Sequence, residues 1–161
     1  MALEQVDWPP EDARWFWMLW RPVPGHEDYN AQQQAECCAC FQLILARCGP
    51  HHRASGHGQT MLHETVSRDH GVGVQLATIL LDAGARLDVR DDLLESTPLG
   101  WAAVGGVEMV KLFLARGADP VEADAAPWAT PRAWAEKMHR TRNCGTASFR
   151  QIRTFRVARG R

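Results

Sequence analysis

One part of the chain repeats itself at an interval of 33 residues, and this period restricts the fold more than any other feature. The related segments are Leu81–Ala85 with Leu114–Ala118, and Ser96–Leu99 with Ala129–Arg132. Further copies of the two patterns lie upstream, at Leu45–Gly49 and Gln59–His63. Repeats of this length are units that cannot bury their apolar faces alone and therefore stack on their neighbours. The sequence predicts a stack of such units.

Each unit has the signals of two short helices. Thr97 can cap a helix whose first residue is Pro98, because the missing N–H of proline costs nothing there. Gly105-Gly106 ends that helix, and the apolar residues of Val107–Leu114 recur at helical spacing. Gly117 then offers the left-handed backbone that commonly ends a helix. The unit is therefore a helix, a tight link, a second helix and a polar loop.

This pattern resembles the ankyrin repeat. The run Thr97–Ala103, followed by Gly105, Val110–Leu114 and Gly117–Asp119, is similar to that family's pattern, and the resemblance extends over residues 57–139. Gly100 departs from it, since the family usually has histidine there. The resemblance implies an all-α ankyrin-repeat solenoid of about four helix-pair units with atypical N- and C-terminal caps. It also implies that the ring of His63 hydrogen-bonds the backbone of a neighbouring loop.

The length of 161 residues fits one domain. We expect a single ankyrin-repeat domain over residues 1–161. Its units are an atypical N-terminal capping repeat at 1–56, repeats at 57–92 and 93–124, a truncated C-terminal repeat at 125–142 and a basic tail at 143–161. In the first unit, one helix between Pro9 and Pro22 and a second over Ala31–Cys48 are predicted. Tryptophans of the earlier helix would cover the first repeat, or form a docking patch.

Composition excludes several classes of protein. Eighteen Lys and Arg against nineteen Asp and Glu, with 45% hydrophobic residues, are typical of a globular domain. The longest strongly apolar run, Trp15–Trp20, is far shorter than the ~20 residues of a membrane span. Five cysteines, an odd number, give no regular disulfide framework. We therefore expect a cytoplasmic protein without a membrane span.

Neither a metal site nor a catalytic motif is predicted. On a helix, Cys37, Cys40 and Cys48 share a stripe with Phe41 and Ile44, which favours packing in the core over metal binding. The cysteines and histidines lack the paired ligand spacing of zinc sites. No nucleophile elbow, phosphate-binding loop or metalloprotease motif is present. We expect no enzyme activity, no cofactor and no small-molecule ligand.

The loops between repeats are the predicted binding site, since loop tips and first helices line the concave surface of a solenoid. Residues 82–124 hold nine acids against four bases, with apolar residues among them. This composition suits a partner protein segment that carries Lys or Arg beside hydrophobic residues. Solubility alone could also explain the acids. The predicted partner-binding residues are Asp91, Asp92, Leu93, Leu94, Trp101, Asp124, Trp128 and Arg132.

A basic tail offers an alternative function. No acid follows Glu136, whereas eight Lys and Arg do, and four of these recur every third residue as Arg150, Arg153, Arg156 and Arg159. These arginines could bind phosphates of nucleic acid or another anionic surface. The apolar residues beside them could instead complete the last repeat. A third hypothesis folds the tail onto the acidic loops of its own chain or of a neighbour.

Overall fold

A computed structural model describes residues 30–53, 57–66 and 72–142. The described residues form six helices and, apart from an isolated antiparallel bridge between Arg53 and Thr60, no strand. The helices are α2 (Ala31–Cys48), α3 (Met61–Val66), α4 (Val72–Asp82), α5 (Pro98–Gly105), α6 (Val107–Ala115) and α7 (Pro131–Arg142). The all-α solenoid predicted from the repeats is confirmed.

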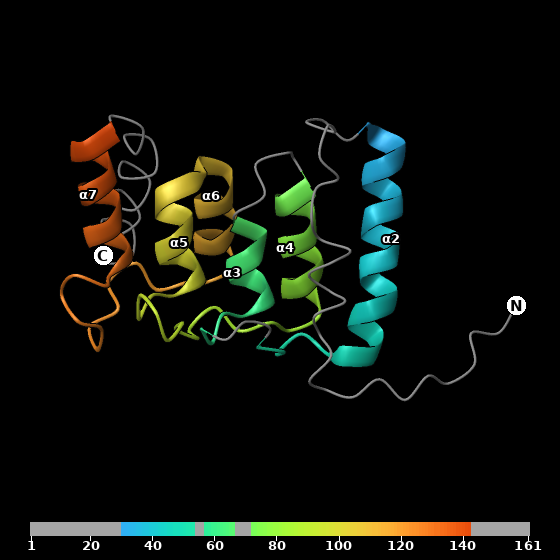
Figure 1. Ribbon diagram of the computed structural model, residues 1–161, viewed down its shortest axis with the longest axis horizontal. Coiled ribbons are helices and arrows are strands. Elements are labelled where there is room, and N and C mark those ends of the chain that lie inside the picture. Colours follow the sequence, from blue (N-terminus) through green and yellow to red (C-terminus); the bar gives the residue numbers. More distant parts are fainter. Residues whose placement is uncertain (1–29, 54–56, 67–71, 143–161) are drawn as a thin grey trace, which may run out of the picture.

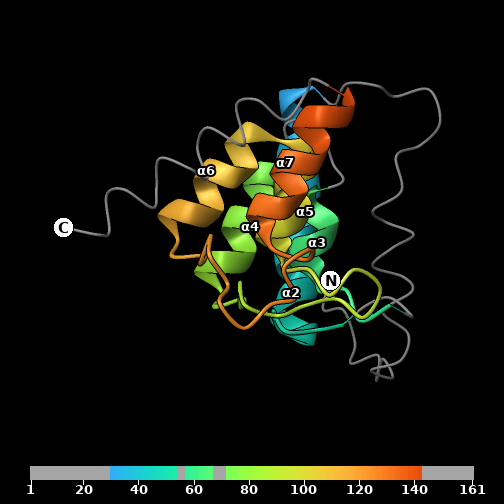
Figure 2. The same ribbon diagram turned by 90° about the vertical axis from the view of Figure 1, so that its left-hand side faces the viewer.

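The helices stand in two rows (Figures 1 and 2). One row contains α3, α5 and α7, and the other contains α2, α4 and α6, with contacts between successive members of each row. Within a unit, α3 packs on α4 and α5 packs on α6. The loops that join one helix pair to the next lie together along one edge, beneath the helices in Figure 1. Side chains from several loops therefore meet at that edge.

Local sequence explains where these helices begin and end. Asn30 caps α2 by accepting a hydrogen bond from the Gln33 backbone N–H, and Thr97 caps α5 by accepting one from the Gly100 N–H. Gly117 follows α6 with a φ of 95°, which favours glycine because it has no Cβ to clash. The predicted boundaries of α2 and of the α5–α6 pair are thus confirmed.

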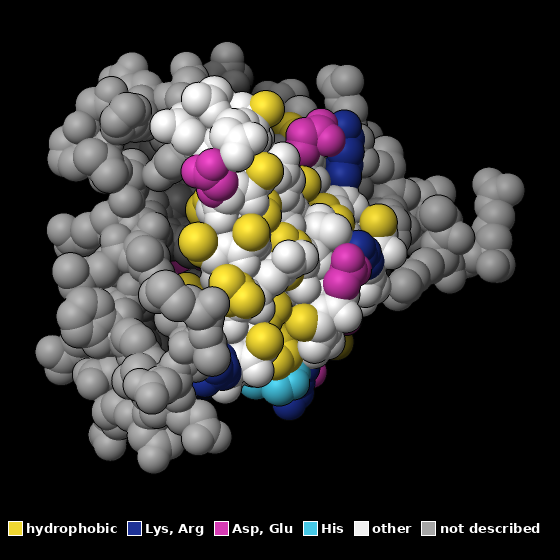
Figure 3. Space-filling model, turned by 90° about the vertical axis from the view of Figure 1, so that its right-hand side faces the viewer, with side chains coloured by type: hydrophobic (Ala, Val, Ile, Leu, Met, Phe, Trp, Pro, Cys, Tyr) yellow, Lys and Arg dark blue, Asp and Glu magenta, His cyan; other side chains and the backbone are white. Residues whose placement is uncertain are grey.

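The core lies between the rows. Leu80, Leu99, Val110 and Phe113 are completely buried, and Met61 and Leu62 nearly so. At the α2 end of the row, the helix buries Phe41 and Leu45 against its neighbours. Its opposite face carries exposed hydrophobic side chains, including Leu43, at the end of the solenoid (Figure 3). The tryptophan helix predicted to cover the first repeat lies outside the described residues, as does the tail.

The prediction for the cysteines is only partly right. Cys37 is half-buried, but Cys40 and Cys48 are exposed, so the prediction that they pack in the core is wrong for these two. Cys38 is half-buried instead, and its thiol lies 3.3 Å from Oε1 of Gln75 on α4. Because α4 covers α2 from one side only, the buried stripe is centred on Phe41 and Leu45 and leaves Cys40 and Cys48 in solvent.

Candidate partner-binding surface

We call the loops that precede α3, α5 and α7 the first, second and third loops. A buried histidine, His63, joins the first loop to the second. The backbone N–H of Thr60 donates to Nδ1 of His63 over 3.0 Å, which leaves Nε2 to donate to the carbonyl oxygen of Ser96, also 3.0 Å away. Burial lowers the pKa of His63, so the neutral ring that this pattern requires is favoured. The bond to a neighbouring loop that the family resemblance implied for His63 is confirmed.

In the next unit Gly100 stands in place of this histidine, and the side chain of Ser96 connects the second loop to the third. The hydroxyl of Ser96 lies 3.5 Å from the carbonyl oxygen of Ala129, one unit further along the chain. A Cβ on Gly100 would overlap this hydroxyl and would stand 3.5 Å from Cδ1 of Trp134. Gly100 therefore allows the serine to approach the third loop in place of the usual imidazole.

Asp91 supports the second loop from inside. Its carboxylate is buried and accepts hydrogen bonds from the backbone N–H groups of Leu94 and Ser96, at 3.0 and 2.9 Å. The indole N–H of Trp101 lies 3.4 Å from the same carboxylate. A carboxylate used in this way is not available to a partner. We therefore remove Asp91 from the predicted binding residues and correct its role to that of a loop support.

Trp101 is half-buried on α5, near the loops. Its ring meets the ring of His63 edge to face, with centroids 5.9 Å apart and an interplanar angle of 85°. This geometry is favourable for aromatic pairs. Trp101 therefore links the packing of α3 and α5 and exposes only part of its surface.

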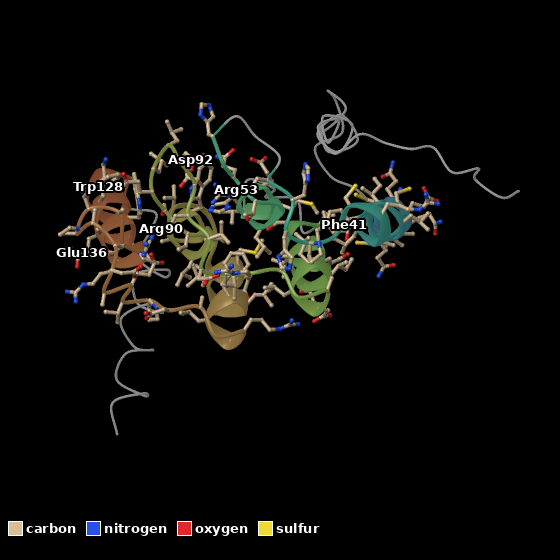
Figure 4. The ribbon with its side chains drawn as sticks, turned by 90° about the horizontal axis from the view of Figure 1, so that it is seen from below. Phe41, Arg53, Arg90, Asp92, Trp128 and Glu136 are labelled. Carbon is tan, nitrogen blue, oxygen red and sulfur yellow. The ribbon has the colours of Figure 1, made fainter. Side chains whose placement is uncertain are left out.

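Two arginines connect successive loops along the loop edge (Figure 4). Arg53 pairs with Asp92 at 3.4 Å and also donates to the carbonyl oxygen of Arg90. Arg90 in turn donates two hydrogen bonds of 3.0 Å to Asp124. These bonds raise the pKa of Arg90 and lower that of Asp124. Asp92 and Asp124, both predicted as partner contacts, are thus already paired within the chain.

Glu122 is a residue that the sequence analysis missed. It is only 6% exposed, its backbone is left-handed with a φ of 44°, and Oε1 accepts a 2.6 Å hydrogen bond from the Thr97 hydroxyl. Oε2 lies 3.2 Å from Nη2 of Arg90. Burial raises the pKa of Glu122, whereas the bonds from Thr97 and Arg90 lower it. Arg90 and Asp124 lie 34 positions apart, close to the repeat period. This spacing is the feature of the sequence that could have indicated the network.

The most exposed large apolar side chains of these loops are Leu93 and Trp128, 57% and 54% exposed, followed by Val121 at 46%. Leu94 is half-buried beside Leu93. Arg132, on the first turn of α7, is exposed and pairs with Glu136 at 2.8 Å. We use the name loop-tip surface for the residues that remain accessible here, which are Asp92, Leu93, Leu94, Trp101, Asp124, Trp128 and Arg132.

We also searched the described residues for metal ligands, clefts and membrane-spanning helices. No group of three or more His, Cys, Asp or Glu side chains in it could hold a metal ion. A cleft of about 350 Å³ lies between the second and third loops, beside Arg90 and Glu122. Its buried polar groups bond mainly to each other, although Nε of Arg90 finds no partner among the described residues.

Of the described helices, none is long and apolar enough to cross a membrane.

A comparison with known families finds a match. The model described as ankyrin repeats, three copies, matches residues 29–124. The match begins earlier than the resemblance found in the sequence, so that it includes α2, and it ends before α7. A search of curated proteins finds none that matches the chain. The four arginines of the nucleic-acid hypothesis, Arg150, Arg153, Arg156 and Arg159, lie outside the described residues.

Proposed function

Because the chain belongs to the ankyrin-repeat family, whose repeats generally mediate protein–protein interaction and which is typically non-enzymatic, we propose that it is a non-catalytic scaffold that binds a partner protein through the loop-tip surface. The helix pairs hold this surface as a rigid support. Loops positioned by such a support are common sites of recognition.

The observation that carries the proposal is the exposure of Leu93 and Trp128 on loops of successive units. Covering a large apolar side chain that is otherwise in water lowers the free energy of the complex. Tryptophan is also enriched among the residues that dominate binding. Leu94 and Trp101 lie partly buried behind them and enlarge the apolar area. We assign affinity to these four side chains.

Carboxylates beside the apolar side chains support selectivity. Asp92 and Asp124 are 66% and 81% exposed although each is paired with an arginine of its own chain. An ionised carboxylate accepts up to about four hydrogen bonds, so each can also receive a lysine or arginine of a partner. We propose a partner segment with basic residues beside hydrophobic ones, and Arg132 as the contact for an acid of that partner.

The proposed location is the cytoplasm. The four described cysteines, Cys37, Cys38, Cys40 and Cys48, are free thiols. Free thiols on an exposed helix are usual in a reducing compartment.

The test is affinity capture from host lysate with the full chain, in three forms. These are the wild type, the L93A/W128A variant, and an L43A control that removes an equally exposed leucine from α2 at the far end of the solenoid. We expect the wild type and L43A to retain the same protein, and L93A/W128A to retain at least tenfold less, since two anchors are lost. Equal capture by all three forms would refute the proposal.

A nuclease treatment separates the nucleic-acid alternative. Capture through the loop-tip surface should not change when nucleic acid is digested. Capture that disappears with nuclease and persists in L93A/W128A would favour the arginine tail as the binding element.

A further inference from the structure

The partner chemistry that suits the loop-tip surface occurs within the chain itself. In the basic tail, residues 143–161, each of Arg150, Arg153 and Arg156 follows directly after a hydrophobic residue, namely Phe149, Ile152 and Phe155. We infer that this tail binds the loop-tip surface of its own chain and competes there with the partner protein. The inference rests on the proposed function of that surface.

Charge is the first argument. Residues 82–124 carry nine acids and four bases, whereas residues 137–161 carry eight bases and no acid. At the loop edge, Glu95 is exposed and forms no ion pair with any described residue, and the pair between Asp92 and Arg53 is long, at 3.4 Å. These carboxylates can accept further guanidinium groups without breaking the pairs already present. The body and the tail therefore attract each other.

The exposed apolar groups are the second argument. Leu93 and Trp128 offer apolar contact to the phenylalanines of the tail, and the face of an indole attracts an arginine guanidinium. A purely acidic surface would bind any cation. Apolar side chains among the acids favour a segment in which arginine and aromatic residues alternate closely, as in the tail.

Reach is the third argument. In Figure 1, α7 starts at the loop edge and runs away from it. Its twelve residues, Pro131–Arg142, span about 18 Å at ~1.5 Å per residue. An extended chain covers up to ~3.3 Å per residue, so residues 143–149 can cover about 23 Å and return to the loops before Arg150. Such a short link gives a local tail concentration on the order of millimolar, which makes weak contacts effective.

The consequence is that a partner must displace the tail. Binding of the partner would then be strengthened by a change that weakens only the tail's charge contacts, such as substitution of its arginines. Raised ionic strength would weaken the charge contacts of the tail and of the partner alike, because exposed charge pairs are screened over ~10 Å at 0.1 M salt. The tail therefore competes with the partner, and a partner of low affinity does not displace it.

The experiment uses the full chain and ¹⁵N NMR at low salt, with no partner present. The variant carries Arg→Glu at positions 150, 153, 156 and 159, and the matched control carries Arg→Lys at the same positions. We expect the amide signals of Leu93 and Asp124 and the indole signal of Trp128 to shift in the Glu variant and to remain near wild type in the Lys control. Added salt should move the wild-type signals toward those of the Glu variant.

Three outcomes would overturn the inference. Identical loop signals in the Glu variant and wild type mean that the tail does not dock. Shifts confined to α6 mean that the tail completes the last repeat. A perturbation that grows with protein concentration assigns the contact to a neighbouring chain. The signals of the buried residues Leu62 and Val110 report whether each variant is folded.

The two proposals fail separately. If the loop-tip surface binds a partner but not the tail, L93A/W128A loses capture while the Glu variant leaves the NMR signals unchanged. If the tail docks but no partner uses the surface, the signals shift and capture is the same in all forms.

Discussion

Replacing His63 with alanine tests whether the histidine bridge holds the stack together. The substitution leaves the Thr60 N–H and the Ser96 carbonyl without their partner, and both residues are buried. Each unsatisfied buried group costs about 1–3 kcal/mol, and partial access of water to the vacated space reduces the sum. We expect a loss of about 3 kcal/mol in the free energy of unfolding, or roughly 6–12 °C in Tm for a chain of this size.

The assay is urea unfolding followed by circular dichroism at pH 7.5. His51→Ala is the matched control, because His51 is exposed in the turn after α2 and should change the free energy of unfolding by less than ~0.5 kcal/mol. A loss below about 1 kcal/mol in H63A would refute the idea that the bridge is a main support of the stack.

The same bridge predicts a dependence on pH. The pKa of His63 is lowered in the folded chain, so below the unfolded value of ~6.5 the unfolded chain binds more protons. Stability should therefore be highest above pH ~6.5 and fall as the pH drops below it, by up to ~1.4 kcal/mol per pH unit. H63A should lose this part of the pH dependence and H51A should keep it. A wild-type slope that H63A retains in full would contradict the assignment.

Three further substitutions test the loops and their supports. Gly100→Ala should destabilise by about 1 kcal/mol, because its Cβ meets the Ser96 hydroxyl, although alanine in a helix normally gains a similar amount. Arg90→Met should cost about 3 kcal/mol at neutral pH, since it leaves Glu122 buried without its cation, and adding Glu122→Gln should recover part of that loss. Glu136→Ala removes the pair with Arg132, whose side chains are 34% and 54% exposed, and should change stability by less than ~0.5 kcal/mol. Urea unfolding gives the free energy of unfolding of each variant.

Each of these substitutions has an internal comparison. Gly106→Ala places its Cβ 3.9 Å from the nearest side-chain atom, so a loss equal to that of Gly100→Ala would show that crowding at Ser96 is not the cause. For Arg90→Met, a loss that remains unchanged at acidic pH, where Glu122 is protonated, would contradict the role of an unpaired carboxylate. A loss above 1 kcal/mol for Glu136→Ala would contradict the small contribution expected of a partly exposed pair.

The helices could be predicted because their ends depend on neighbouring residues. Thr97, Pro98 and Gly117 act through their own backbone geometry or through groups within three residues, so a single segment contains the information. The role of His63 also followed from a local pattern, once the family resemblance was recognised. Local chemistry repeated at 33 residues was sufficient for the fold.

The loop acids could not be assigned from sequence, because their partners depend on how each loop folds and how the units stack. Asp91 looks like an exposed turn former, but it folds inward to bond Ser96 and Trp101. Arg90 reaches Asp124 across 34 positions, and only the stacked units bring them together. Apolar Leu93 and Trp128 were easier to predict, since no polar partner decides where they lie.

The arginine pairs also fix the order in which the units of this protein follow one another. Arg90 reaches forward to Asp124, and Arg116 reaches back to Asp82, each across 34 positions. A tandem duplication of the segment from Arg90 to Ala123 would place a second Arg90, and not Asp124, 34 positions after the first, and a second Arg116 34 positions after Arg116. Such a duplication sets arginine opposite arginine at the joint, so a unit of this chain cannot be copied in tandem without new surface chemistry there.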